Sequence, residues 1–197
     1  ALKARAVKDG NSHYRLTGAK AFISGGGYSD IYLVMCRTGE EGPKGISCIL
    51  VENGAEGLSF GANERKMGWN AQATATVNLD SVRVPAAQLI GGEGKGFSIA
   101  MNGLNGGRLN IAACSLGAAQ AALDKAVAYM KERKAFGKSL AHFQALQFKI
   151  ADMETELQAA RIFLYQAAWK LGRNAPDARK FCAMAKRLVT DTGFRVA

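Results

Sequence analysis

The 197-residue sequence contains only three prolines and two histidines, and its four cysteines stand far apart. Cys36, Cys48, Cys114 and Cys182 form no CxxC pair, and with so few histidines they make a poor set of metal ligands. We therefore predict no metal site, and we expect the four thiols to be buried and reduced. No apolar run approaches the ~20 residues that a membrane-spanning helix needs, so we predict no membrane partner.

Acidic residues are scarce in the second half of the chain. Residues 1–93 carry 10 basic and 9 acidic side chains, whereas residues 94–197 carry 16 basic and 7 acidic ones. Such a cationic region indicates either an anionic partner or a solvated surface. The basic residues are not interleaved with aromatic ones, as they would be on a platform that stacks nucleobases. We expect no nucleic acid partner, and keep a basic, non-enzymatic nucleic-acid-binding module as an alternative.

Residues 1–92 have the pattern of a β domain, and 14 of the 23 glycines fall there. Turn-forming residues separate its apolar runs, which are His13–Ser24, Ile31–Cys36, Ile46–Val51, Leu58–Phe60 and Ala75–Val84. Because no helical pattern intervenes, these strands predict an antiparallel sandwich or small barrel and not a Rossmann sheet. We also expect Lys3–Lys8 to form a solvated strand edge.

Residues 93–197 change to a helical period, with apolar residues every three or four positions over 109–130 and again over 146–171. A third apolar stripe consists of Phe181, Met184 and Leu188. The pattern predicts three long helices in an antiparallel bundle. Since the third period is still running at the last residue, we expect an incomplete bundle in a truncated chain. The predicted fold class is multi-domain α+β, with a β domain at 1–92 and a helical domain at 93–197.

Three glycine-rich stretches are candidate sites. Gly91–Phe97 could cradle a phosphate, but Phe97 stands where a Walker motif requires lysine, so a strand-to-helix turn is the alternative. In Lys20–Gly27 a strand ends in a hydroxyl and three glycines, which fits a planar ligand or a loose turn. Gly103, Gly106 and Gly107 fall inside the first predicted helix, where each glycine costs roughly 0.5–1 kcal/mol relative to alanine. We predict that something passes close to that backbone.

The first predicted helix ends in the cationic stretch Arg133–Gly137, and His142, Phe143 and Gln144 follow shortly after it. Cations at a helix C-terminus suit the helix dipole without any ligand, and they also suit an anion. Neither histidine lies in an arrangement with a Ser or Cys nucleophile, so a hydrolase triad is excluded.

Taken together, these stretches resemble the acyl-CoA dehydrogenase family over essentially the whole chain. The matching strings, in order, are KAFISGG, KGISCILVE, the KMGW loop, GGEGKGF, GLNGGR, ERKAFGKSL with FQALQFKIADM, and AMAK. The strings around GLNGGR and FISGGG resemble the branch of the family that acts on short, branched acyl chains. The resemblance implies a middle β domain and part of a C-terminal helical bundle, without the N-terminal helical domain and the last helix.

The resemblance also implies the reaction, which is FAD-dependent α,β-dehydrogenation of a short, branched acyl-CoA. Electrons would then pass to an electron-transferring flavoprotein, and the assembly would be a homotetramer. The expected location is the cytoplasm in a bacterium and the mitochondrial matrix in a eukaryote. An acyl-CoA oxidase or a flavin monooxygenase relative is the alternative within the same fold.

Site residues follow from the matching positions. The family's contacts to the flavin ring correspond to Phe22, Ile23 and Ser24. Its contacts to the FAD of the neighbouring subunit correspond to Arg133, Phe143 and Gln144. Its contacts to the acyl-CoA correspond to Asn105, Gly106, Gly107 and Arg108. The Ser24 hydroxyl would hydrogen-bond the reactive ring nitrogen, and Phe22 replaces the more usual tryptophan.

The catalytic base has no match in this sequence. One branch of the family places its glutamate immediately before the helix arginine, where this chain has Gly107. In the short-chain branch the glutamate lies further along, so we expect the base beyond Ala197. The polypeptide alone is therefore expected to be catalytically incompetent.

Overall fold

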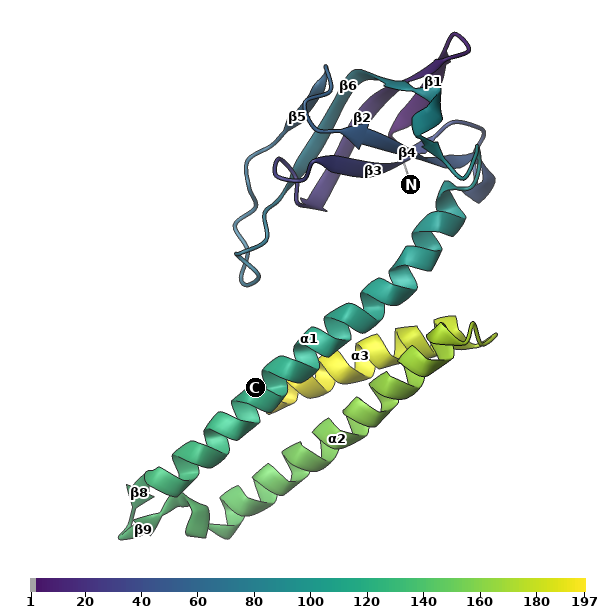
Figure 1. Cartoon of the computed structure of the whole chain (residues 1–197). Coiled ribbons are helices and arrows are strands. Elements are labelled where there is room, and N and C mark those ends of the chain that lie inside the picture. Colours follow the sequence, from purple (N-terminus) through teal and green to yellow (C-terminus); the bar gives the residue numbers. More distant parts are fainter. Residues whose placement is uncertain (1–2) are drawn as a thin grey trace. The chain divides into compact units, whose positions relative to one another are not determined.

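The structure, a computed structural model, describes residues 3–197 and divides into two compact units. We call Ala1–Met101 the sheet unit and Asn102–Ala197 the helical unit. The division falls inside the first long helix, α1 (Gly96–Glu132). Figure 1 labels most strands of the sheet unit and the three long helices.

The sheet unit contains one seven-stranded sheet in the order β5-β6-β2-β1-β3-β4-β7. Its strands are β1 (Arg5–Asp9), β2 (His13–Ser24), β3 (Ile31–Arg37), β4 (Ile46–Glu52), β5 (Leu58–Phe60), β6 (Thr74–Pro85) and β7 (Leu89–Ile90). The predicted strands are confirmed to within a residue or two. Neighbouring strands are antiparallel except β1 and β3, which pair in parallel at Arg5 and Arg37. Because β1 lies between β2 and β3, the prediction of a strand edge at Lys3–Lys8 is wrong.

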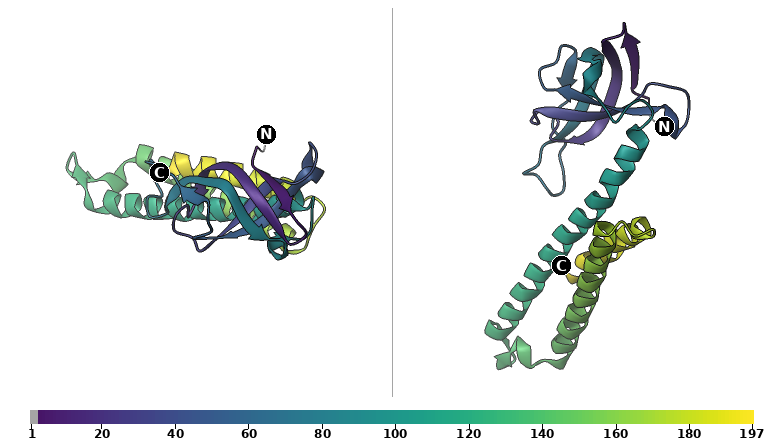
Figure 2. Two further views of the ribbon diagram at one scale, coloured as in Figure 1. Left: turned by 90° about the horizontal axis from the view of Figure 1, so that it is seen from above. Right: turned by 45° about the vertical axis from the view of Figure 1, so that its right-hand side comes forward.

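Alternating burial along the strands places the apolar side chains on one face of the sheet, which curls around them (Figure 2). The core contains Tyr14, Leu16, Ile49, Val51, Val77 and Val82, with Cys36 against them. Cys48 is also buried. A single curled sheet wraps around one apolar core, so this unit is built as a small, open barrel.

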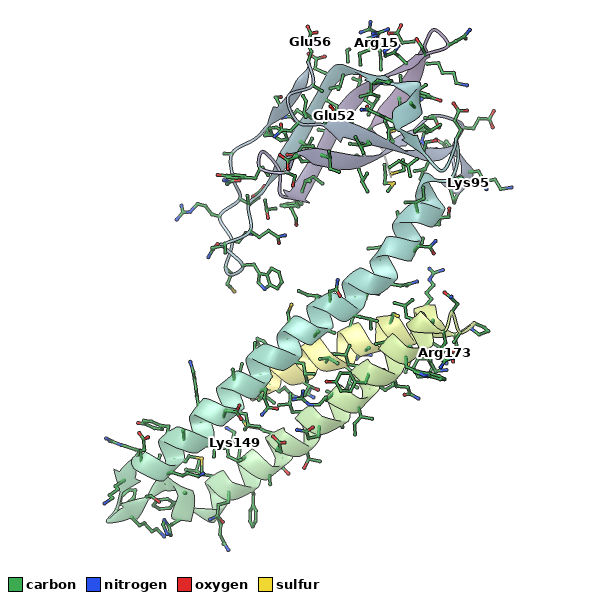
Figure 3. All side chains as sticks on the ribbon, in the orientation of Figure 1. Arg15, Glu52, Glu56, Lys95, Lys149 and Arg173 are labelled. Carbon is green, nitrogen blue, oxygen red and sulfur yellow. The ribbon has the colours of Figure 1, made fainter. Side chains whose placement is uncertain are left out.

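The helical unit contains most of α1, then α2 (Gln144–Gly172) and α3 (Ala178–Val196), with successive helices antiparallel (Figure 1). A two-stranded hairpin, β8 (Lys134–Ala135) and β9 (Lys138–Ser139), joins α1 to α2. Arg173 lies at the end of α2, beside the turn into α3 (Figure 3). The three predicted helices are confirmed, whereas the hairpin was not predicted.

The core of the helical unit takes small and medium side chains from all three helices. The predicted apolar stripe on α3 is wrong, because Met184 and Leu188 are exposed. Instead α3 buries Cys182, Ala185 and Val189, whose small side chains let the helices approach closely. At Gly193 an added Cβ would overlap the Ser115 hydroxyl of α1.

All four cysteines are free thiols, and three of them are buried as expected. The expectation is wrong for Cys114, which is exposed because it lies on α1 outside the packed stripe of Ala112, Leu116 and Ala119. Across residues 3–197, no helix combines the length and apolar character needed to cross a membrane. No group of three His, Cys, Asp or Glu side chains in that range is placed to hold a metal ion.

Candidate cofactor and substrate sites

The C-terminal end of β2 presents Phe22, Ile23 and Ser24 around a local irregularity. The pairing of β2 with β6 shifts register between Lys20 and Ile23, as at a β-bulge. Phe22 adopts a left-handed backbone with φ 57°, which is strained for a bulky residue, and its side chain is 75% exposed. The bulge therefore turns an aromatic ring away from the sheet core, as such irregularities do beside functional sites.

The three glycines after Ser24 form a tight turn and not a loose one. Gly25 and Gly27 have positive φ angles, and an added Cβ on Gly26 would press against Ala75. The Tyr32 hydroxyl of β3 pins the turn: it accepts a hydrogen bond from the Gly27 N–H at 3.0 Å and donates to the Gly25 carbonyl at 3.2 Å. The turn geometry explains this glycine run without requiring a ligand.

A cavity of about 300 Å³ lies beside this strand end and is lined by residues of β2, β3 and β6. Ile23, Ser24 and Lys20 contribute from β2. Burial lowers the pKa of Lys20, whose ammonium donates a hydrogen bond to the Met35 carbonyl of β3 at 2.5 Å. Sequence reasoning included Lys20 only as the first residue of the Lys20–Gly27 stretch and did not predict its burial, because a lysine beside a glycine-rich turn gives no sign of being half-buried.

The stretch Gly91–Phe97 is a strand-to-helix turn that attaches α1 to the sheet. The Gly94 N–H donates to the buried Ser47 hydroxyl of β4 at 3.0 Å, and a Cβ on Gly96 would overlap the Ser47 main chain. Glu93 accepts a hydrogen bond from the Tyr14 hydroxyl at 2.5 Å and pairs with Lys8 at 3.1 Å. Because this stretch bonds to the protein's own groups, the contacts favour a structural strand-to-helix turn over a phosphate-binding site.

Asn105, Gly106, Gly107 and Arg108 lie in one continuous turn of α1. Arg108 donates to the Asn105 side-chain carbonyl at 3.0 Å. An added Cβ on Gly103, Gly106 or Gly107 would meet no described atom within 4 Å, the helix's own backbone aside. Packing within the described chain therefore gives no reason for three glycines in this helix, despite their cost to helix stability.

The hairpin end of the helical unit brings together Arg133, Phe143 and Gln144. Phe143 caps the start of α2, and the Arg133 carbonyl accepts a hydrogen bond from the Leu140 N–H at 2.8 Å. The Phe136 and Phe143 rings meet edge-on at 6.3 Å, and the Lys138 ammonium lies 4.5 Å from the Phe143 ring centre. The structure thus places Phe136 and Lys138 against Phe143, contacts that the sequence did not predict.

The matches to family models cover most of the chain in two parts. Residues 1–82 match the acyl-CoA dehydrogenase middle domain, and residues 94–197 match the acyl-CoA dehydrogenase C-terminal domain. The chain therefore belongs to the acyl-CoA dehydrogenase family, a family of flavoproteins, as its motifs predicted.

Two similar relatives are mitochondrial isobutyryl-CoA dehydrogenases. The one from Dictyostelium discoideum is 57% identical over 99% of this chain and 47% of its own length. The one from Bos taurus is 54% identical over 94% of this chain and 45% of its own length. The solved butyryl-CoA dehydrogenase from Megasphaera elsdenii superposes with a TM-score of 0.95 at 42% identity, over 99% of this chain and 51% of that one. The chain thus spans about half the length of these relatives.

Proposed function

We propose that the protein is an FAD-dependent acyl-CoA dehydrogenase that oxidises a short, branched acyl-CoA such as isobutyryl-CoA. Such an activity would belong to valine or fatty acid catabolism. The observation that carries the proposal is the exposed, strained Phe22 at a strand end beside a cavity, in a chain 57% identical to an isobutyryl-CoA dehydrogenase. In the proposed assignment the β domain (1–92) binds flavin and acyl-CoA, and the helical domain (93–197) is part of a larger bundle.

The donors and ring faces at the β2 strand end fit a flavin. The exposed Phe22 ring would lie against the planar ring system, with Ile23 beside it. The exposed Ser24 hydroxyl would donate a hydrogen bond to the reactive ring nitrogen. When bound, FAD would accept the hydride that leaves the β carbon of the substrate.

The hairpin end fits the diphosphate of a second FAD, the one held by a neighbouring subunit. The exposed Arg133 guanidinium could pair with phosphate oxygens through two parallel donors. Phe143 and Gln144 would contact the same cofactor. Because these residues would serve a neighbour's FAD, a working site would require at least two subunits.

The glycines of α1 fit the acyl-CoA. Without side chains at Gly106 and Gly107, a thioester and its pantetheine arm could lie directly against the helix backbone. Asn105 and Arg108 would flank that approach. The base that takes the α proton cannot stand at position 107, since glycine has no carboxylate, and we propose that it comes from outside residues 1–197.

The proposed assembly is a homotetramer that passes electrons to an electron-transferring flavoprotein. The face of α2 opposite its core carries Phe148, Thr155, Ile162 and Trp169 at intervals of seven residues, with Tyr165 at its side. The four large side chains of this set are each 62–69% exposed, which is unusual for a helix face turned away from its own core. We call these five residues the outer α2 stripe and propose it as a contact between subunits.

The test is the visible absorption spectrum of the full-length protein, followed by anaerobic titration with isobutyryl-CoA. Oxidised-flavin bands that bleach on titration are expected. Bands that bleach only with another acyl-CoA would support the proposed dehydrogenation but overturn isobutyryl-CoA as the substrate. Rapid reoxidation of the bleached protein by oxygen would favour the oxidase alternative. A colourless protein that takes up no added FAD would overturn the proposal.

A further inference from the structure

The sheet opens between β2 and β3. Strand β1 lies between them and pairs with β2 from His13 to Thr17, but β2 continues to Ser24. Beyond the end of β1, Lys20 of β2 reaches the Met35 carbonyl of β3. The cavity beside Ser24 lies at this opening, so Lys20 spans the gap in the sheet that also borders the proposed flavin site.

Lys20 has no ion pair with a carboxylate among residues 3–197. The other titratable group beside it is the buried Cys36 thiol, whose pKa burial raises to about 11, so this thiol remains neutral near pH 7. The remaining residues that line the cavity are uncharged. A half-buried ammonium with a carbonyl as its partner therefore places an uncompensated positive charge at the cavity.

A charge in such a place acts on whatever occupies the cavity mouth, because apolar walls screen it less than water does. Lys20 and Ser24 line the same cavity of about 300 Å³, so a ligand at Ser24 would share that cavity with the Lys20 charge. At a separation of roughly 10 Å and an effective dielectric of about 20, one unit charge changes a charge-forming equilibrium by about tenfold. The effect is therefore large enough to measure.

We propose that Lys20 raises the reduction potential of a flavin bound at the Phe22–Ser24 strand end. This inference rests on the proposed function. In the proposed reaction the substrate would lose a proton from its α carbon to the catalytic base and a hydride from its β carbon, and a flavin that took up the hydride would gain one negative charge. Lys20 neither gives nor takes a proton in this step. Its ammonium attracts the added charge and so favours the reduced cofactor.

The experiment compares the midpoint potential of bound FAD in the full-length protein and in three variants, by anaerobic reductive titration against a reference dye. Lys20→Gln keeps a donor for the Met35 carbonyl but removes the charge, whereas Lys20→Arg keeps the charge. Lys44→Met is the control, because Lys44 is an exposed lysine of the same unit that does not line the cavity.

Lys20→Gln is expected to make reduction about tenfold less favourable at equilibrium, while Lys20→Arg and Lys44→Met stay near the wild-type potential. An unchanged potential in Lys20→Gln with bound FAD would overturn the inference and leave the proposed function intact. If Lys20→Gln fails to fold, Lys20→Arg is the deciding variant. A potential in Lys20→Arg far from that of the wild type would mean that the positive charge at position 20 does not set the flavin potential. A wild-type protein that takes up no FAD would overturn both.

Discussion

The sheet unit and the helical unit differ in how they dispose of large apolar side chains. In the sheet unit most of the exposed ones lie near the β2 strand end and its cavity, as Phe22, Ile31 and Leu33 do, or on the loop that carries Met67 and Trp69. In the helical unit they form the outer α2 stripe, and Met184, Leu188 and Phe194 expose more apolar surface on α3. Exposed apolar residues beside a cavity suit a small ligand, whereas an exposed apolar stripe along a helix suits a contact with another protein surface.

In the proposed assignment the exposed apolar surface of the sheet unit contacts the cofactor, while that of the helical unit contacts another subunit. The contrast also explains the cationic second half, since Arg and Lys on the remaining helix faces keep an otherwise apolar bundle solvated. Stability of the helical unit should then depend on protein concentration, by mass action.

The largest effect is expected from a charge in the outer α2 stripe. In Ile162→Glu, association would bury an unpaired carboxylate, so we expect self-association to weaken by at least about 100-fold. Light scattering coupled to gel filtration measures the change. Val7→Glu is the matched control, because Val7 is also an exposed aliphatic residue but lies on the sheet unit. An unchanged assembly in Ile162→Glu would remove the proposed contact from this face.

Cavity-forming substitutions compare the two cores. Leu16 in the sheet core and Leu157 in the helical core are both fully buried, so Leu16→Ala and Leu157→Ala should each cost about 3 kcal/mol. Denaturant unfolding at several protein concentrations measures both. Only the transition that Leu157→Ala shifts should move with concentration. If both transitions moved equally, the contrast between the units would be wrong.

The hydrogen bond between Tyr14 and Glu93, just before α1, should contribute less to the free energy of unfolding than the buried leucines do. Tyr14→Phe removes the hydrogen bond to Glu93, and we expect a loss of about 1–2 kcal/mol, since Glu93 retains Lys8 and some solvent. Denaturant unfolding at pH 7 measures it. Ser12→Ala, which removes an exposed hydroxyl of the same unit, is a suitable control.

Tyr14 also predicts that the stability of the folded protein depends on pH. Burial, with the hydrogen bond to Glu93, raises the pKa of Tyr14 to about 12. The unfolded chain ionises near pH 10. Stability from the neutral phenol is therefore complete below pH 10 and is lost as the pH rises from 10 to 12. The wild type should lose more stability over that window than Tyr14→Phe, and equal slopes would contradict the assignment.

The strands and helices were predictable from sequence because they depend on local periods of burial. The place of β1 between β2 and β3 was not, since it depends on pairing between distant segments. On α3 two apolar stripes compete, and the sequence pattern favours the stripe of larger side chains. The structure buries Cys182, Ala185 and Val189 instead, because small side chains permit close helix packing.

The candidate site was predicted from family motifs more than from physical chemistry. Alternation and glycine content indicated a strand ending at Ser24, but the bulge and the left-handed Phe22 depend on register with β6. The burial of Lys20 was not predicted because it arises from β3, which is brought near by topology. The hairpin was missed because Phe136-Gly137 replaces the usual Asn-Gly of a tight turn.

The smallest expected change in stability comes from the hairpin of β8 and β9. Phe136 and Gly137 both have positive φ angles, as in a type I′ turn, and the Phe136 side chain is 94% exposed. Asparagine tolerates this backbone better, so Phe136→Asn should stabilise the helical unit by about 0.5–1 kcal/mol. Thermal unfolding measures the gain, and Phe136→Ala, which removes the ring without favouring the turn, is the control.

Phe22 gives the sheet unit an equivalent position, an exposed aromatic residue in the left-handed region. If both aromatic rings contact FAD, each substitution to asparagine should raise stability and lower cofactor retention. Retention is measured as the flavin remaining after dialysis. A gain in stability with full retention at Phe136 but loss at Phe22 would confine the flavin contact to the sheet unit. Loss at both positions would show that each unit keeps a strained aromatic residue for the same ligand.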